Sequence, residues 1–214
     1  IKEIGNQGWR LIPTWAGHQP PCGSYRNPFP YNVDQAYAYG VQNADQAKER
    51  MAEYGLLDSN QRGGLIYLDV EYFNTSNTAC VAATQAFVQG WTTRLNSLGI
   101  GSGLYMTSSN LNRAKIYELN PPPAVVWIAE WSSTPGYNPN ASPYGLRHLP
   151  DYHWSNHQRI RQYSGGSNET WGGVTLNIDP NVSDGMVMAM ANLPPKKPTV
   201  SATITAEKGI GDWY

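Results

Sequence analysis

The stretch Gly64-Leu-Ile-Tyr-Leu-Asp-Val-Glu71 decides the fold and is also the first pointer to a function. It is a short run of strand-forming residues that ends in two carboxylates separated by one valine. Successive side chains of a strand point to opposite faces, so Asp69 and Glu71 share one face, together with Tyr67. A strand that is apolar on both faces is typical of a parallel sheet covered by helices. We therefore expect a buried strand of an α/β domain.

The two carboxylates are a candidate acid/base pair. The rise of a strand places their Cα atoms about 6–7 Å apart. At that range two like charges raise the pKa of one group, as an acid catalyst requires. Parallel α/β barrels place their catalytic groups at the carboxyl ends of the strands, which is where Asp69 and Glu71 stand. The alternative is that both are structural acids, bonded to neighbouring strands or to loop N–H groups.

Strands and helices alternate along the chain, which indicates a parallel sheet. Capping residues and helical periodicity predict helices near residues 1–8, 33–54, 78–98, 108–119 and 184–191. Apolar stretches predict six strands, near residues 9–16, 64–71, 101–106, 124–131, 159–163 and 174–179. Six strands suit either a (β/α) barrel that lacks two of its eight strands or an open, doubly wound sheet.

Length and composition narrow the classes of function. We place one domain at residues 1–192 and a Pro/Lys/Thr-rich linker or tail at residues 193–214. The 15 basic and 16 acidic residues give a net charge of −1, so we expect neither nucleic acid nor an anionic membrane surface as a partner. No run of 18 apolar residues occurs, so we expect no membrane-spanning helix. Tryptophan (8) and tyrosine (14) are abundant, and their rings either fill the core or stack on sugars.

The chain has two cysteines, Cys22 and Cys80. Both lie in polar segments near the ends of predicted elements, so they form either one disulfide between loops or two free thiols. The low charge and the even number of cysteines favour an oxidising setting, and we expect a secreted or cell-surface protein. The sequence begins at Ile1 without a signal peptide, and we expect the native start to lie upstream.

Other polar and aromatic side chains are weaker candidates for a site. Glu130 lies at the end of the predicted strand at residues 124–131. It either points into the same site as the acid pair or binds an arginine. Tyr67, Tyr105 and Trp127 are either core residues or platforms for sugar rings. The loop histidines lack the carboxylate or cysteine spacing of a zinc site, so we expect no metal and no cofactor.

Several segments together resemble a known family. They are Gly8-Trp-Arg-Leu-Ile-Pro-Thr-Trp-Ala-Gly-His-Gln19, Ile66-Tyr-Leu-Asp-Val-Glu-Tyr72, Trp127-Ile-Ala-Glu-Trp131, His157-Gln-Arg-Ile-Arg-Gln-Tyr163 and Asn168-Glu-Thr-Trp-Gly-Gly-Val-Thr-Leu-Asn-Ile-Asp179. These segments are similar to the glycoside-hydrolase-like domain of unknown function that occurs in secreted actinobacterial proteins, a family that is itself similar to the family 25 lysozymes. The match covers about residues 8–185, and it implies an α/β fold, a (β/α)8 TIM-type barrel that lacks its first two strands in this chain.

The resemblance implies roles for three acids. Glu71 matches the general acid of the lysozymes, and Asp69 matches its neighbouring carboxylate. In a substrate-assisted reaction the N-acetyl group of the sugar attacks, and Asp69 orients it. Asp179, at the end of the last predicted strand, matches a further active-site acid; its alternative role is to cap the turn before Pro180.

The resemblance also implies a cleft wall and a partner. Gln162 and Tyr163 fall where the lysozymes carry a Trp-Gln-Tyr strand that lines the cleft, and Arg161 replaces the tryptophan. The family begins with two strands ahead of the segment that matches Trp9. We therefore expect another polypeptide, or an N-terminal segment of the same protein, to complete the barrel.

These observations lead to one expected function and two rivals. We expect an extracytoplasmic glycoside hydrolase that acts on an N-acetylated glycan such as peptidoglycan and uses the Asp-x-Glu pair. The first rival is a catalytically silent module that binds carbohydrate at a cell wall or surface. The second is a structural module that assembles with another polypeptide.

Overall fold

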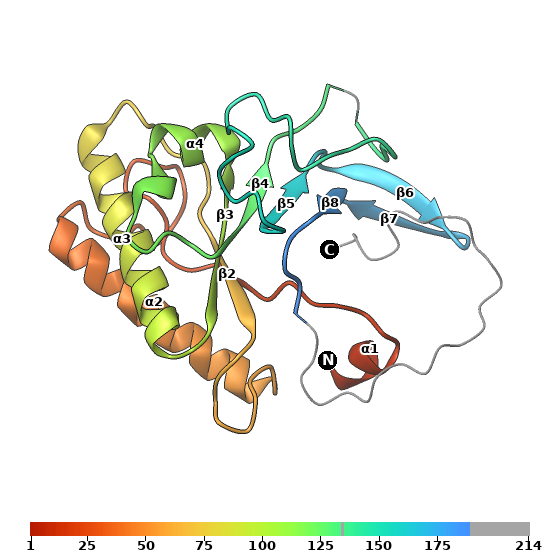
Figure 1. Ribbon diagram of the computed structural model, residues 1–214. Coiled ribbons are helices and arrows are strands. Elements are labelled where there is room, and N and C mark those ends of the chain that lie inside the picture. Colours follow the sequence, from red (N-terminus) through yellow and green to blue (C-terminus); the bar gives the residue numbers. More distant parts are fainter. Residues whose placement is uncertain (134, 189–214) are drawn as a thin grey trace.

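The computed structural model describes residues 1–133 and 135–188, and it shows a mixed α/β domain (Figure 1). The helices α2, α3 and α4 lie on one side of a mainly parallel sheet. In chain order the elements are α1 (Lys2–Asn6), β1 (Thr14–Trp15), α2 (Val33–Glu53), β2 (Leu65–Asp69), α3 (Thr78–Ser97), β3 (Gly101–Thr107), α4 (Ser108–Arg113), the 3-10 helix η1 (Ile116–Glu118), β4 (Val125–Ala129), β5 (Arg159–Gln162), β6 (Ser167–Trp171), β7 (Val174–Ile178) and β8 (Asn181–Ser183).

The main sheet has six strands in the order β1-β2-β3-β4-β5-β8. The first five are parallel, as the alternation of strands and helices predicts, and β8 runs antiparallel to β5. β6 and β7 form a separate antiparallel hairpin that extends away from the sheet (Figure 1). The prediction of a parallel sheet strand at residues 174–179 is therefore wrong, because this segment pairs with the polar residues 167–171 instead.

The sheet is open within the described residues, so the expected (β/α)8 TIM-type barrel is not observed as a closed barrel. At one edge the antiparallel β8 occupies the side of β5 where a further parallel strand would pair. At the other edge stands the two-residue β1, beside an apolar groove of about 500 Å³ that Leu11, Ile12 and Met51 help to line. The fold is thus a mixed α/β domain with a mainly parallel sheet, and completion of a barrel by another segment stays a prediction.

The two long helices begin at asparagine caps and cross at glycines. The side chains of Asn32 and Asn77 accept hydrogen bonds from backbone N–H groups in the first turns of α2 and α3, and both helices begin where the sequence predicts helices. A Cβ at Gly40 of α2 would lie 2.0 Å from the carbonyl oxygen of Phe87 in α3, and a Cβ at Gly90 would lie 2.2 Å from a carbonyl of α2. Only glycine allows the helices to approach this closely.

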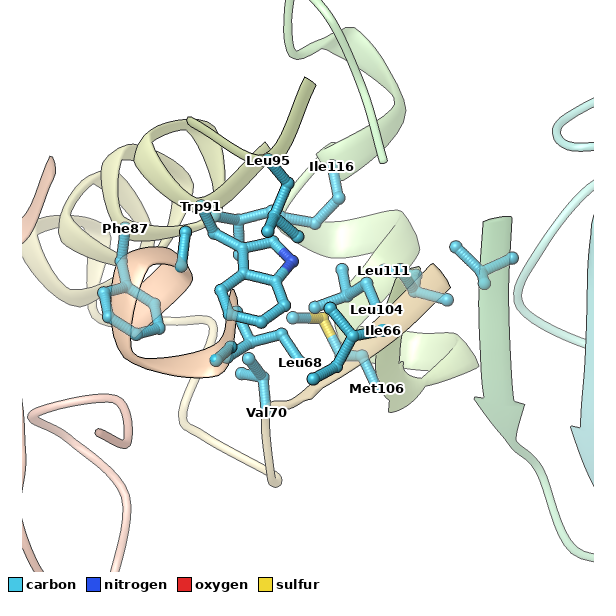
Figure 2. Packing of buried hydrophobic residues seen from close by; sticks show 14 of the residues in the cluster. Ile66, Leu68, Val70, Phe87, Trp91, Leu95, Leu104, Met106, Leu111 and Ile116 are labelled. Carbon is cyan, nitrogen blue, oxygen red and sulfur yellow. The ribbon is translucent and has the colours of Figure 1, made fainter. Parts of the chain in front are cut away.

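The main core lies between these helices and the helix-facing side of the sheet (Figure 2). Ile66, Leu68 and Val70, from the stretch at residues 64–71, point toward Trp91 and Phe87 of α3. All five side chains are nearly inaccessible to solvent. Burying a large apolar side chain contributes about 1.5–3 kcal/mol, so this layer fixes the position of β2.

The opposite face of the sheet carries a smaller apolar cluster. Ile12, Leu65, Tyr67, Val125 and Ile160 form it. This is the face that also carries Asp69, because alternate side chains of β2 point the same way. The face is therefore apolar at the amino ends of the strands, and its polar groups lie toward the carboxyl ends.

Two predicted helices differ from the structure. The helix at residues 108–119 is interrupted, because Lys115 adopts a left-handed conformation with φ of 49° between α4 and η1. The helix predicted at residues 184–191 is not formed over residues 184–188, where Met188 instead makes an antiparallel bridge with Leu11. The rest of that helix and the predicted tail at residues 193–214 lie outside the described residues.

The first predicted strand is shorter than expected. Regular pairing is restricted to Thr14–Trp15, because Pro13 has no N–H to donate to a neighbouring strand. The carbonyl oxygen of Pro13 still accepts a hydrogen bond from the N–H of Tyr67. The long loop that follows leads into the disulfide.

Cys22 and Cys80 form a disulfide, with their Cα atoms 6.0 Å apart. The bridge joins the long loop after β1 to the first turn of α3. Closing a loop of this length stabilises a domain by roughly 4 kcal/mol relative to the reduced chain. Within residues 1–133 and 135–188, no helix combines the length and the apolar composition that crossing a membrane requires.

Candidate active site

The carboxyl ends of four neighbouring parallel strands bring the predicted site residues together. In the register of the sheet, Asp69 at the end of β2 pairs with Tyr105 of β3, and Tyr105 pairs with Trp127 of β4. Trp127 pairs with Ile160 of β5, and Gln162 ends β5 two residues further along. All four side chains lie on the sheet face that the long helices leave uncovered, because they alternate with the residues of the main core.

Asp69 is partly buried, and its environment disfavours the ionised form. Its Oδ1 atom is buried and has no hydrogen-bond partner among the described residues. Burial, followed by the negative charge of Glu71, raises the pKa of Asp69 to about 6. The acid pair thus contains one carboxyl with a raised pKa, as the spacing predicts, and this carboxyl is Asp69.

Glu71 follows β2 and is held through its backbone. Its N–H donates to Oε1 of Gln19 (3.0 Å), and Nε2 of Gln19 donates to the carbonyl oxygen of Asp69 (2.8 Å). The amide of this buried glutamine therefore takes the place of a neighbouring strand where β1 has already ended. The hydroxyl of Tyr25 donates to Oε2 of Glu71 (3.4 Å), and burial together with the charge of Glu71 raises the pKa of Tyr25.

Tyr105 lies among the acids. Burial is the main cause that raises the pKa of its phenol, and the negative charges of Glu71, Asp69 and Asp179 raise it further. Its hydroxyl therefore stays protonated at neutral pH and acts as a hydrogen-bond donor. The structure thus brings all three predicted acids into electrostatic reach of a single tyrosine.

Gln162 is the hydrogen-bonding centre of the site. Its Oε1 accepts from the hydroxyl of Tyr105 (3.1 Å) and from Nε1 of Trp131 (3.1 Å). Its Nε2 donates to Oδ2 of Asp179 (3.3 Å). The second oxygen of Asp179 accepts from the N–H of Gly166 (2.7 Å), so both of its oxygens are oriented. Only 7% of Gln162 is exposed, so its amide holds its three neighbours in place, and its expected contact with a glycan stays a prediction.

Trp131 is an exposed ring beside this centre, and the sequence did not single it out as a site residue. It is 62% exposed although its indole N–H is bonded to Gln162. The ring stands against Gly165, where a Cβ would lie 2.4 Å from Cζ2 of Trp131. Its place just beyond the carboxyl end of β4 was the signal available in the sequence.

Tyr67 and Trp127 line the base of the site. Tyr67 is fully buried, and its hydroxyl donates to the carbonyl oxygen of Met186 (3.0 Å). Nε1 of Trp127 donates to Oδ1 of Asn181 (2.8 Å), and its ring meets Tyr105 edge-on at 5.1 Å between centroids. The ring of Trp127 therefore contacts Tyr105 on one side and Tyr67 (6.1 Å between centroids) on the other, and the structure does not expose Tyr67 to a ligand.

Glu130 and Tyr163 lie outside the group centred on Gln162. The carboxylate of Glu130 accepts hydrogen bonds from the hydroxyl of Ser108 and from the N–H of Arg147 (2.8 Å). Tyr163 is 3% exposed, and its hydroxyl accepts from the N–H of Asn138 (3.4 Å). The structure thus places both at the loops that follow the strands, and their expected contact with a glycan stays a prediction.

Comparison with known proteins agrees with the resemblance found in the sequence. No curated protein matches the chain. Among solved structures, the Clostridium perfringens spore cortex lytic enzyme SleM is similar, with 16% identity and a TM-score of 0.48 over 87% of this chain and 54% of that one. The chain thus spans about half the length of that enzyme. An uncharacterized B. stearothermophilus protein is also similar, with 16% identity and a TM-score of 0.43 over 78% of this chain and 69% of that one.

The family of the chain follows from its sequence. Residues 1–183 match the model of one family, and the protein therefore belongs to the Rv2525c-like, glycoside hydrolase-like domain family.

Proposed function

We propose that this domain is an extracytoplasmic glycoside hydrolase that cleaves an N-acetylated glycan such as peptidoglycan. The observation that carries the proposal is the unequal environment of two neighbouring carboxyls. Asp69 has a pKa raised to about 6, whereas Glu71 lies beside it and reaches the hydroxyl of Tyr25. Glycosidic cleavage needs one carboxyl that holds a proton and a second group that balances the developing positive charge.

The pair holds one proton below about pH 6. When the amide N–H of a bound sugar donates to Asp69, that hydrogen bond favours the ionised form of Asp69 and leaves the proton on Glu71. Glu71 is then the general acid, and Asp69 orients the N-acetyl group. This assignment gives each carboxyl the role that the family resemblance implies.

The reaction proceeds in two steps. In the first, the acetyl carbonyl oxygen attacks the anomeric carbon, the bond from that carbon to the glycosidic oxygen breaks, and Glu71 gives its proton to the departing oxygen. Asp69 balances the charge of the oxazolinium ion. In the second, Glu71 takes a proton from a water molecule, whose oxygen attacks the anomeric carbon, and the N-acetyl group is restored.

The remaining groups bind and orient the sugar. Tyr105 donates a hydrogen bond at the centre of the acids, and Asp179 presents a carboxylate that is already held by Gln162 and Gly166. Trp131 offers a flat exposed face beside them, as sugar-binding sites commonly do. The disulfide supports an extracytoplasmic location, because such bonds persist in oxidising compartments.

The test compares the full native chain with Glu71→Gln on purified peptidoglycan. Release of new reducing ends should fall by at least about 100-fold, because the variant has no proton to donate. The melting temperature and binding to the glycan should change little. Glu53→Gln is the matched control, since Glu53 is an exposed residue whose side chain pairs with Arg50 far along α2. Equal release by the parent and Glu71→Gln would refute the assignment.

A catalytically silent glycan-binding module is the second candidate. The open sheet favours it, because the acids lie on one face of an open sheet and not inside a closed barrel within the described residues. Such a module would sediment with the glycan and release no reducing ends, either as the parent or as Glu71→Gln. The same experiment therefore separates the two functions.

A further inference from the structure

A second pocket lies at the opposite end of the sheet from the acids. It has a volume of about 300 Å³, and its lining includes Ala124 and Gln158, which directly precede β4 and β5. Both strands are parallel to β2, so this pocket is at the amino ends while Asp69 is at a carboxyl end. A five-residue strand spans about 16 Å, which is too far for the pocket to be part of the same cleft.

Three aromatic rings form one side of the pocket. Tyr117 and His153 are stacked, with their centroids 3.9 Å apart and their planes at 22°. The ring of Tyr152 approaches His153 at 4.4 Å and is tilted by 50°, so the rings make an open corner and leave no slot for a flat heterocycle. Tyr152 is 75% exposed, which is unusual for a large ring at the mouth of a pocket.

Buried hydrogen bonds hold this corner in place. The guanidinium of Arg159 is fully buried and donates to the carbonyl oxygens of His153 (2.9 Å) and Pro150 (2.6 Å). Nε1 of the buried Trp154 donates to the carbonyl oxygen of Pro123 (2.7 Å). The segment that carries the rings is therefore fixed before any ligand arrives, which lowers the entropy cost of binding.

The polar atoms of the pocket are available and uncharged. Within the described residues, no hydrogen bond is found at either ring nitrogen of His153 or at the hydroxyl of Tyr117 or Tyr152. Burial and the charge of Arg159 lower the pKa of His153, so its ring is neutral at neutral pH. In the part of the chain that the structure describes, no acidic or basic side chain lines the pocket apart from this neutral histidine. Such a lining disfavours phosphates and other ions and suits a neutral polar ligand.

We propose that this pocket is a second glycan-binding site, which takes a neutral pyranose ring such as N-acetylglucosamine. One C–H face of the sugar lies on Tyr152, and its hydroxyl groups bond to His153 and to Oε1 of Gln158. The site anchors the domain to a polymer independently of the cleft, so that the two sites together bind a long glycan more tightly than either does. The class of ligand rests on the function proposed above.

The test is an NMR titration of the Glu71→Gln protein with the N-acetylglucosamine tetramer, which the variant does not consume. The chain has 4 histidines, so the imidazole signals of His153 are assignable by comparison with His153→Gln. We expect these signals to shift and saturate in the millimolar range. Tyr152→Ala should weaken this binding by at least about fivefold, a loss equivalent to one stacked ring. Tyr54→Ala is the matched control, because Tyr54 is 57% exposed at the end of α2.

Two outcomes overturn the proposal. If the His153 signals do not move, or if Tyr152→Ala binds as tightly as its parent, the pocket is no sugar site. If only the indole signal of Trp131 moves, the glycan binds in the cleft alone. The failure of the hydrolase proposal looks different, since the native chain would then release no reducing ends while the His153 signals still shift.

Discussion

Asp69→Asn is expected to stabilise the domain at neutral pH while it removes activity. Burial and the charge of Glu71 raise the pKa of Asp69 from 3.8 to about 6, so ionising this carboxyl costs free energy in the folded state. About two pKa units correspond to at most about 3 kcal/mol, and solvent at the partly exposed carboxyl reduces this toward about 1 kcal/mol. Asparagine avoids the cost. A gain of this size raises the melting temperature by roughly 2–10 °C.

The sign of the pH dependence follows from the direction of the shift. Because the pKa of Asp69 is higher in the folded than in the unfolded chain, the folded state binds more protons between about pH 4 and pH 6. The free energy of unfolding of the parent therefore falls as the pH rises through this window. The Asp69→Asn variant lacks this contribution, so the two proteins should be equally stable near pH 3.5 and differ most above about pH 6.5.

Urea unfolding at several pH values, followed by tryptophan fluorescence, measures the difference. Asp184→Asn is a control of opposite sign, because hydrogen bonds from Tyr144 and His157 lower the pKa of Asp184. That variant should lose stability at neutral pH, and the loss should vanish at low pH. If Asp69→Asn instead destabilises the domain at neutral pH, the carboxylate is a bonded structural acid and the reasoning is refuted.

Three further predictions concern the site and the helices. The kcat/KM of the native chain should fall about tenfold per pH unit above about pH 6, as the acid pair loses its proton; a pH-rate profile measures this. Gly165→Ala should push the ring of Trp131 aside and raise KM by about 2–10-fold, measured on a soluble oligosaccharide. Gly40→Ala should cost about 1–3 kcal/mol of stability in urea unfolding, because its Cβ would meet the backbone of α3.

Each of these has a result that would contradict it. A rate that stays level between pH 6 and pH 8 would show that the shared proton does not limit the reaction. An unchanged KM in Gly165→Ala, alongside an unchanged KM in Trp131→Ala, would remove the ring from the binding site. Normal stability of Gly40→Ala would mean that the helices separate at little cost.

The sequence predicts those features that local residues determine. The alternation in residues 65–69 places Asp69 on the face opposite the main core, and Asn32 and Asn77 begin the two long helices where helices are expected. The parallel order of β1 to β4 follows from the helices that connect these strands. These features depend on side-chain direction, capping and connection length, all of which act within a few residues.

The remaining features depend on contacts between distant segments. The partner of β7 was not predicted, because β6 (Ser167–Trp171) is a polar stretch without apolar alternation to mark it as a strand. The role of Gln162 depends on three partners at residues 105, 131 and 179, which only the folded sheet brings together. Likewise, Gln19 supports Asp69 across 50 residues of sequence. The amino-acid sequence alone gives no direct sign of such hydrogen bonds between side chains.

If the domain is the hydrolase proposed above, the support of the acid pair by Gln19 links its catalysis to the redox state of the protein. Gln19 stands three residues before Cys22, in the loop that the disulfide ties to α3. In a reducing compartment this loop loses its covalent anchor, and the glutamine that orders Asp69 and Glu71 is held by weaker contacts alone. We expect a freshly synthesised chain to be a poor catalyst until its thiols are oxidised.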